Sequence, residues 1–515
     1  MSLSMFFCQK TFHLLLTGCL KMLFNSFEFV IYFPIVFFAY LVLPKRIKPV
    51  WLLLASYYFY MCWNAKYIVL ILFTTLITYV SALLIGNTDK IKTKKIYLAG
   101  GITVNLLVLF LFKYFDFFIS NINSILSKFG ISQLSNPFDF LLPVGISFYT
   151  FQAIGYVIDV YRGDTPAEKN IINYALFVSF FPQLVAGPIE RSKNLLSQIK
   201  TIREKNLFNY ESMVSGFGIM LWGLFLKVMI ADRAAVLVDN VFLSYYSYGT
   251  VELILAALLF SVQIYADFAG YSSIAIGAAR VLGINLCANF NTPYFAISIA
   301  DFWSRWHISL STWFKDYVYI PLGGNRKGKF RKYLNLLITF LVSGLWHGAS
   351  WNYVVWGLLH GIYRVFGEIT ANFRDKAYDL LNVKRNVFSF NLLKRIVTFI
   401  LVAFAWIFFR ARSLKVAIGY ISKMFTRFNP WVLSDESIYT LGLDRQEFST
   451  LLISLVLLFA VSYVTYKRKT DIGTIIASQN LWFRWVVFIG IIVTILVFGE
   501  YGINFDSAKF IYFDF

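Results

Sequence analysis

Long apolar runs separated by short polar loops dominate the sequence. They lie at about 27–43, 50–63, 67–86, 96–119, 141–161, 211–231, 251–279, 333–346, 350–366, 392–409, 449–466 and 482–499. Many approach the roughly 20 residues that a helix needs to cross a bilayer. Because lipid offers the backbone no hydrogen-bond partners, such runs predict helices and not open sheets. The pattern predicts an all-α polytopic membrane protein.

Two further runs depart from this pattern. The run 173–190 contains Pro182, Gly187 and Pro188 and is flanked by charged loops, whereas 302–321 is apolar but carries charged side chains. We expect re-entrant or interfacial helices in both places, since such elements are tolerated where protein covers them or where they line a cavity. They suggest a funnel from the cytoplasm toward the membrane centre.

Composition and charge agree with a membrane protein. Of the 515 residues, 58% are hydrophobic and 14% are charged, against about 25% charged in soluble domains. The net charge of +20 is explained by basic cytoplasmic loops, and no nucleic-acid-binding motif accompanies it. Basic residues follow the first span at 45–48 and the third at 90–95. These loops are predicted to be cytoplasmic, which places the N-terminus outside.

The first 21 residues look separate from the rest. Met22 opens a segment that already spans a membrane, and Cys19 ends a short LTGC box that resembles a lipoprotein cleavage site. A cleaved signal directly before a span would be unusual. We therefore expect residues 1–21 to be an extension outside the fold, and 22–515 to form one transmembrane domain with a C-terminal tail at 500–515.

The stretch 301–361 holds three of the four histidines, namely His307, His347 and His360. Between Tyr333 and Tyr363 there is no Lys, Arg, Asp or Glu, and His347 lies in the middle. An ionisable group at membrane depth is costly and is a functional candidate by default. A neutral buried imidazole can accept a hydroxyl proton. His347 lies near the midplane if 333–363 is one helix, or at the far end of a short helix if the chain breaks at Gly344 and Gly348.

Aromatic residues recur at steps of three and four along 301–321. This spacing predicts one face of a single helix, with Asp301 as its N-cap. Arg305 and His307 then face polar surroundings. His307 has either a hydrogen-bonded structural role or a supporting catalytic role.

The turn 320–332 combines a glycine pair with five basic residues. It is either a solvated cytoplasmic loop or a contact for the phosphate of a thioester donor through Arg326, Lys327 and Lys329.

Asp267 is the only charged residue between Glu252 and Arg280, and Gln263 precedes it by one helical turn. An intramembrane carboxylate needs a partner. We expect it to orient a histidine or an arginine, with proton relay in a transporter as the alternative. Lys227 and Asp232, near a helix end, are predicted to be structural and to snorkel toward the interface.

The sequence contains no G-x-S-x-G or H-E-x-x-H motif, and we expect no metal site. Five blocks, DFWSRWHISLSTWFKDYVYIPLGG, SGLWHG, QIYADFAGYSSIAIG, GISFYTFQAIGY and FFPQLVAGPIER, resemble the membrane-bound O-acyltransferase (MBOAT) family. Within the family the resemblance is to the branch that acetylates polysaccharides such as alginate. It implies a bundle of about 11–13 transmembrane or re-entrant helices around a central tunnel.

The resemblance also implies a chemistry. His347 matches the catalytic histidine and His307 the second important one, with Asp267, Gln263, Arg305, Trp346 and Asn352 in support. The family passes an acyl group from a cytoplasmic thioester, acetyl-coenzyme A or an acyl carrier, to an acceptor outside, without a bound cofactor. Tyr512 in the terminal FIYFDF matches a proposed acyl relay, although Asp514 stands where the family has Gln.

The implied partners are the bilayer of a bacterial inner membrane, an extracytoplasmic SGNH-type acetyltransferase and a polysaccharide acceptor. Peptidoglycan O-acetylation and D-alanyl transfer to teichoic acid are alternatives within the family. A flippase for a lipid-linked glycan is the alternative of another class, and it predicts that Asp267 matters more than His347.

Overall fold

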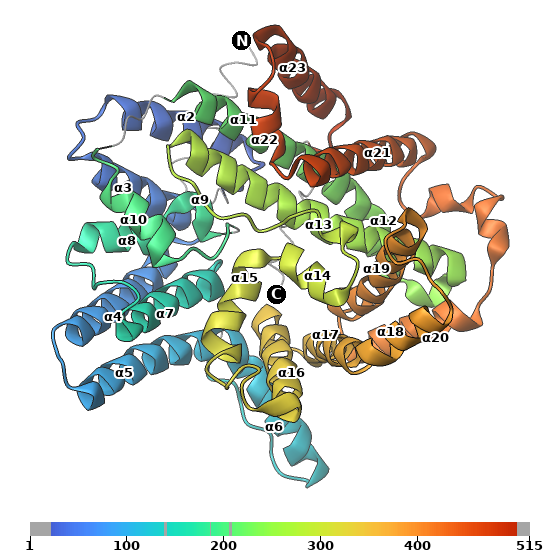
Figure 1. Cartoon of the computed structure of the whole chain (residues 1–515), viewed down its shortest axis with the longest axis horizontal. Helices are drawn as coiled ribbons and strands as arrows, with labels where there is room; N and C mark the ends of the chain where they lie inside the picture. The colour runs from blue at the N-terminus through green and yellow to red at the C-terminus, as the bar shows by residue number, and fades with distance from the viewer. Residues whose placement is uncertain (1–21, 139–141, 186, 205–208, 502–515) are drawn as a thin grey trace. The chain divides into compact units, whose positions relative to one another are not determined.

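A computed structural model describes residues 22–138, 142–185, 187–204 and 209–501, and these residues form helices and no strand (Figure 1). They divide into two compact units. The first takes the described residues up to Met220 together with Ile274–Cys287, and the second takes Leu221–Ser273 and the chain from Ala288 onward. The predicted extension 1–21 lies outside the described residues.

The first unit is built from short and medium helices. They are α2 (Phe27–Val42), α3 (Lys48–Met61), α4 (Ile68–Gly86), α5 (Ile91–Leu109), α6 (Phe115–Lys128), α7 (Ile146–Arg162), α8 (Ile171–Ser179), α9 (Phe181–Leu184), α10 (Ser197–Lys200) and most of α11 (Tyr210–Phe225). A π-helical segment, Phe110–Tyr114, joins α5 to α6, and another, Ser192–Leu196, precedes α10.

The second unit contains His307, His347 and His360. Its helices are α12 (Asp232–Leu243), most of α13 (Thr250–Val281), α14 (Ile299–Arg305), α15 (Ile308–Phe314), α16 (Gly328–His347), α17 (Trp351–Ile369), α18 (Ala371–Leu380), α19 (Phe388–Arg410), α20 (Leu414–Thr426), α21 (Arg445–Arg468), α22 (Ile472–Ala477) and α23 (Leu481–Phe498). The unit also contains two π-helical segments, Leu226–Ala231 before α12 and Lys315–Tyr319 after α15.

Each of the twelve apolar runs predicted as spans contains a helix within its described residues. Within the described residues, seven helical stretches are long and apolar enough to cross a membrane by length and composition. Others are shorter, such as α3 with 14 residues and α2 with 16. The all-α membrane fold is thus confirmed, while the central tunnel stays a prediction.

The two irregular runs are broken helices. The run 173–190 splits at Phe180, after which Pro182 stands in the first turn of α9, a position where the missing N–H costs little. The prediction of one helix over 301–321 is wrong, because α14 ends at Arg305 and α15 begins at Ile308. Asp301 is not the N-cap either, since the side chain of Ser298 accepts the hydrogen bond from the Asp301 N–H at 3.1 Å.

Glycines bring α16 and α17 close together as an antiparallel hairpin. A Cβ on Gly344 would lie 2.3 Å from the carbonyl oxygen of Tyr353, and one on Gly357 would lie 2.3 Å from that of Phe340. Small residues allow such backbone approach between membrane helices. The contact fixes the end of α16, where His347 lies, against the start of α17.

Candidate active site

His347 is the last residue of α16 and is 2% exposed. The chain then extends through Gly348 before α17 starts at Trp351. The second of the two sequence alternatives is therefore confirmed, with one correction: the break falls at Gly348, and Gly344 stays helical because it packs against α17. A Cβ at Gly348 would lie 2.3 Å from the Tyr353 ring.

Aromatic rings surround the imidazole of His347. The ring centroids of Trp346 and Trp356 each lie 4.9 Å away, and that of Phe409 lies 5.4 Å away, all three roughly edge-on. His307, forty residues earlier in the chain, lies 6.5 Å away between ring centroids. The fold therefore gathers the two predicted histidines and Trp346 in one buried cluster.

The backbone of His307 has a left-handed conformation, with φ 42° and ψ 54°. Its neighbours are held on both sides: the Asn291 N–H donates to the Arg305 carbonyl at 2.9 Å, and the Ile308 N–H donates to the Asn289 carbonyl at 2.9 Å. A non-glycine residue kept in this region by its surroundings is a feature that concentrates at functional sites. This turn is why the aromatic periodicity does not continue as one helix.

Burial controls the charge of His307. The side chain is 1% exposed, and its ring packs edge-on against Phe268 at 4.7 Å and near Trp346 at 6.0 Å. Loss of water lowers the pKa of His307 to about 3, so the imidazole is neutral near pH 7. The prediction of polar surroundings is wrong for His307, because these neighbours are aromatic, but it is confirmed for Arg305, which pairs with the Asp301 carboxylate.

Asp267 is buried in an ion-pair cluster. Lys227 Nζ lies 2.8 Å from a carboxylate oxygen of Asp267 and 2.8 Å from one of Asp232. Lys227 also lies 5.3 Å above the Tyr271 ring. Lys227 belongs to the π-helical segment before α12, and its side chain is 1% exposed. It therefore does not snorkel as predicted, and the carboxylate of Asp267 has a lysine partner where we expected a histidine or an arginine.

Two of the predicted supporting residues lie on α14 and α13. Arg305 donates to the Asp301 carboxylate at 2.6 Å and stacks on Tyr466 at 5.5 Å. Gln263 is buried on α13, one turn before Asp267. These contacts of Arg305 are therefore with Asp301, one turn earlier on α14, and with the ring of Tyr466, and not with His347.

Asn352 connects the start of α17 to the end of α19. Its side-chain amide donates to the carbonyls of Phe408 and Ala411, at 3.2 and 2.8 Å, and its oxygen accepts from the Ser350 hydroxyl. These carbonyls end α19, and Phe409 between them packs against His347. Asn352 therefore fixes one wall of the histidine cluster.

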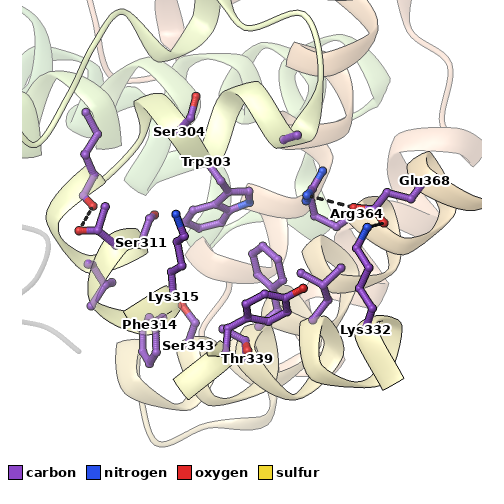
Figure 2. A pocket seen from close by; sticks show the side chains of 17 residues that line it. Trp303, Ser304, Ser311, Phe314, Lys315, Lys332, Thr339, Ser343, Arg364 and Glu368 are labelled. Carbon is purple, nitrogen blue, oxygen red and sulfur yellow. Dashed lines mark hydrogen bonds and ion pairs between the residues drawn. The ribbon is translucent and has the colours of Figure 1, made fainter. Parts of the chain in front are cut away.

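Residues of α14, α15, α16 and α17 line a cleft of about 430 Å³ (Figure 2), and His307 and His347 are not among them. Trp303 lies on one wall, and Lys332, Phe340 and Ser343 of α16 lie on another. Lys332 and Ser343 are eleven residues apart, about 16 Å along a helix. His347 follows Ser343 by one helical turn, so the cleft runs along α16 toward the histidine.

Cations outnumber carboxylates on the cleft wall. Lys332 and Arg364 share the single carboxylate of Glu368, at 2.6 and 3.3 Å. Lys315 also lines the cleft, and Figure 2 shows its side chain pointing inward. Three cations against one carboxylate suit a ligand with phosphate groups.

The predicted phosphate contacts are not among the residues that line this cleft. Arg326, Lys327 and Lys329 are exposed on the loop before α16 and at its first turn. Lys332 from the same basic run does line it. Tyr512 lies outside the described residues, so its predicted role as an acyl relay stays a prediction.

The fold and these side chains define a multi-pass helical membrane protein with a buried histidine pair beside a cationic cleft. The probable alginate O-acetylase AlgI of Pseudomonas putida is 41% identical over 419 residues, which are 80% of this chain and 82% of the relative. Residues 165–409 match the membrane-bound O-acyltransferase family, MBOAT. The chain belongs to this family and is a membrane-embedded acyltransferase.

Two further relatives show the range of the family. A peptidoglycan O-acetyltransferase of Helicobacter pylori is 35% identical over 488 residues, 89% of each chain. A teichoic acid D-alanyltransferase of Streptococcus thermophilus is 30% identical over 236 residues, 44% of this chain and 56% of the relative. These matches favour the enzyme over the flippase alternative.

Proposed function

We propose that this protein transfers an acetyl group from a cytoplasmic thioester toward the hydroxyl groups of an extracytoplasmic, alginate-like polysaccharide. The observation that carries the proposal is the burial of His347 beside His307 at the C-terminal end of α16, one helical turn after the cleft-lining Ser343. The matches to relatives named as O-acetylases support acetyl as the group that is moved.

In the proposed step His347 acts as the general base. Its imidazole takes the proton of a hydroxyl, either that of the acceptor or that of Tyr512. The oxygen attacks the thioester carbonyl, so a C–O bond forms as the C–S bond breaks. The imidazolium then returns the proton to the leaving thiolate. General-base assistance contributes about 10²–10⁴ in rate, and positioning of the two substrates adds to it.

His307 has a supporting role in this proposal. Its buried, neutral ring near His347 offers one donor and one acceptor nitrogen, which suits holding an acceptor oxygen or polarising the thioester carbonyl. The aromatic neighbours exclude water from the cluster, which strengthens such polar contacts and limits hydrolysis of the thioester.

The cleft is the proposed donor site. The basic loop before α16 is predicted to be cytoplasmic, so the end of the cleft with Lys332, Arg364 and Glu368 faces that side in this proposal. There the cations would contact the phosphates of acetyl-coenzyme A or of a carrier phosphopantetheine. The thioester would then extend along α16 past Ser343 toward His347.

In the proposed function, two proteins act in sequence at a bacterial inner membrane. The protein delivers the acetyl group outside, and an SGNH-type partner completes transfer to the polymer. The basic loops at 45–48 and 90–95 support an external N-terminus through the positive-inside bias.

Purified protein in vesicles tests the proposal. Radiolabelled acetyl-coenzyme A and an acetylated carrier are offered in separate arms, and label on the protein or on an added glycan acceptor is measured. The wild type is expected to transfer label in at least one arm, and His347→Ala to lose about 10²–10⁴ of that rate. Full activity in His347→Ala would end the proposed mechanism.

Peptidoglycan is a second candidate acceptor, because the Helicobacter pylori relative covers more of this chain than the alginate O-acetylase of Pseudomonas putida does. Base-released acetate from exopolysaccharide and peptidoglycan fractions, compared with and without the gene, separates the two. Loss of acetate from the peptidoglycan alone would replace the polysaccharide proposal.

A further inference from the structure

A third histidine, His360, has no part in the proposed mechanism. It lies on α17 with 0% exposure. Its Nδ1 accepts a hydrogen bond from the indole N–H of Trp303 at 3.2 Å, and the two ring centroids lie 5.1 Å apart. Since Nδ1 accepts, the neutral ring carries its proton on Nε2.

Trp303 stands between the cleft and the histidine cluster. Its side chain lines the cleft (Figure 2). Its ring packs against Phe340 at 5.3 Å and against Trp356 at 5.8 Å. Trp356 in turn packs edge-on against His347 at 4.9 Å. Two ring contacts therefore lead from the cleft wall to the imidazole.

His360 determines which way this indole faces. A buried indole N–H needs an acceptor, and leaving it without one is costly. His360 is itself enclosed, with Trp356 at 5.1 Å and Phe302 at 6.3 Å between ring centroids. An acceptor in this enclosed position favours the orientation of Trp303 in which the indole N–H reaches it.

We propose that Trp303, positioned by His360, restricts the acyl group that reaches His347 to a short one, so that acetyl is used and longer chains are rejected. This inference rests on the proposed function, because it assumes that the cleft holds the thioester donor. One extra methylene in an apolar pocket changes the rate by about 10–200-fold. A fixed indole wall supplies that discrimination, whereas a mobile one would yield to the longer chain.

The test compares acyl-phosphopantetheines with two, three and four carbons, since coenzyme A and acyl carriers share this group. For each donor, kcat/KM is measured with the full-length protein in vesicles. Trp303→Ala is expected to raise the butyryl-to-acetyl ratio at least about tenfold. His360→Phe, which keeps a ring but removes the acceptor, is expected to raise it by a smaller factor. His360→Asn places an acceptor near the Nδ1 position and is expected to restore the wild-type ratio.

Tyr363→Phe is the matched control. Tyr363 packs against His360 at 5.9 Å and is not among the cleft-lining residues, so its ratio is expected to equal that of the wild type. If Trp303→Ala does not fold, Trp303→Phe removes the donor with less loss of volume. Wild-type acetyl transfer with an unchanged ratio in Trp303→Phe and His360→Phe would overturn this inference alone. Absence of acetyl transfer by the wild type would overturn the proposed function and this inference with it.

Discussion

The imidazole rings of His307 and His347 lie 6.5 Å apart between centroids, although one belongs to the left-handed residue of a turn and the other to the last residue of α16. Neither element alone makes the pair. The turn between α14 and α15 presents His307, and the glycine-packed hairpin of α16 and α17 presents His347. The geometry of the site therefore depends on the backbone as much as on the side chains.

The hairpin contact predicts a contrast between two glycines. Gly344→Ala would push a Cβ to 2.3 Å from the Tyr353 carbonyl and is expected to destabilise the protein by about 1–3 kcal/mol. Gly367 lies on α17 with nothing within 4 Å of its Cβ position, so Gly367→Ala is expected to be neutral or to stabilise by up to about 1 kcal/mol. Thermal unfolding in detergent compares them, and equal midpoints would contradict the close approach.

The ion-pair cluster predicts an unusual recovery. Lys227→Met leaves two buried carboxylates without their shared cation, which is expected to cost about 3–5 kcal/mol. Replacing Lys227, Asp232 and Asp267 together by Met, Leu and Leu removes every charge and is expected to regain most of that stability. Detergent-solubilised yield and unfolding temperature report both. If Lys227→Met were as stable as the wild type, the ion pairs of this cluster would not contribute to stability.

The cleft predicts which lysine the donor needs. Lys315 lines the cleft, whereas Lys327 lies exposed on the loop before α16. Loss of one charged hydrogen bond to phosphate costs about 1.5–3 kcal/mol, so Lys315→Ala is expected to raise KM for the donor about tenfold or more. Lys327→Ala is expected to leave KM unchanged. The reverse result would return the donor phosphate to the basic loop, which was one of the two interpretations of that turn from the sequence.

The buried neutral ring of His307 predicts an acid-dependent stability. Its pKa falls from the usual 6.5 to about 3 on folding. Below pH 6.5 the unfolded chain therefore binds a proton that the folded protein refuses, and the free energy of unfolding falls as pH falls. At pH 5 this amounts to about 2 kcal/mol. His307→Asn is expected to lose less stability than the wild type between pH 7 and pH 5. An identical loss in both would refute the assignment.

Hydrophobicity alone was enough to predict most of the fold. Each of the twelve apolar runs contains a helix, and the glycines around His347 made a break near it one of two alternatives. The turn at His307 was missed because the aromatic spacing from Trp303 to Tyr317 fits a continuous helix, and only the pairing with residues 289–291 interrupts it.

Partners distant in sequence were harder to predict. Asp267 was expected to have a partner, but Lys227 lies forty residues away, and single-sequence periodicity does not report which helices touch. A lysine alone in the apolar run 211–231 was the available signal. In the same way, the spacing of Trp303 and His360 gives no hint of their hydrogen bond.

The left-handed backbone at residue 307 determines how that histidine can be studied. Alanine there would remove the ring and would also be poorly suited to the left-handed backbone, a local penalty of order 1 kcal/mol. Asparagine tolerates the conformation far better. Only a substitution that keeps the left-handed backbone conformation can separate the role of the imidazole from the role of the turn between α14 and α15.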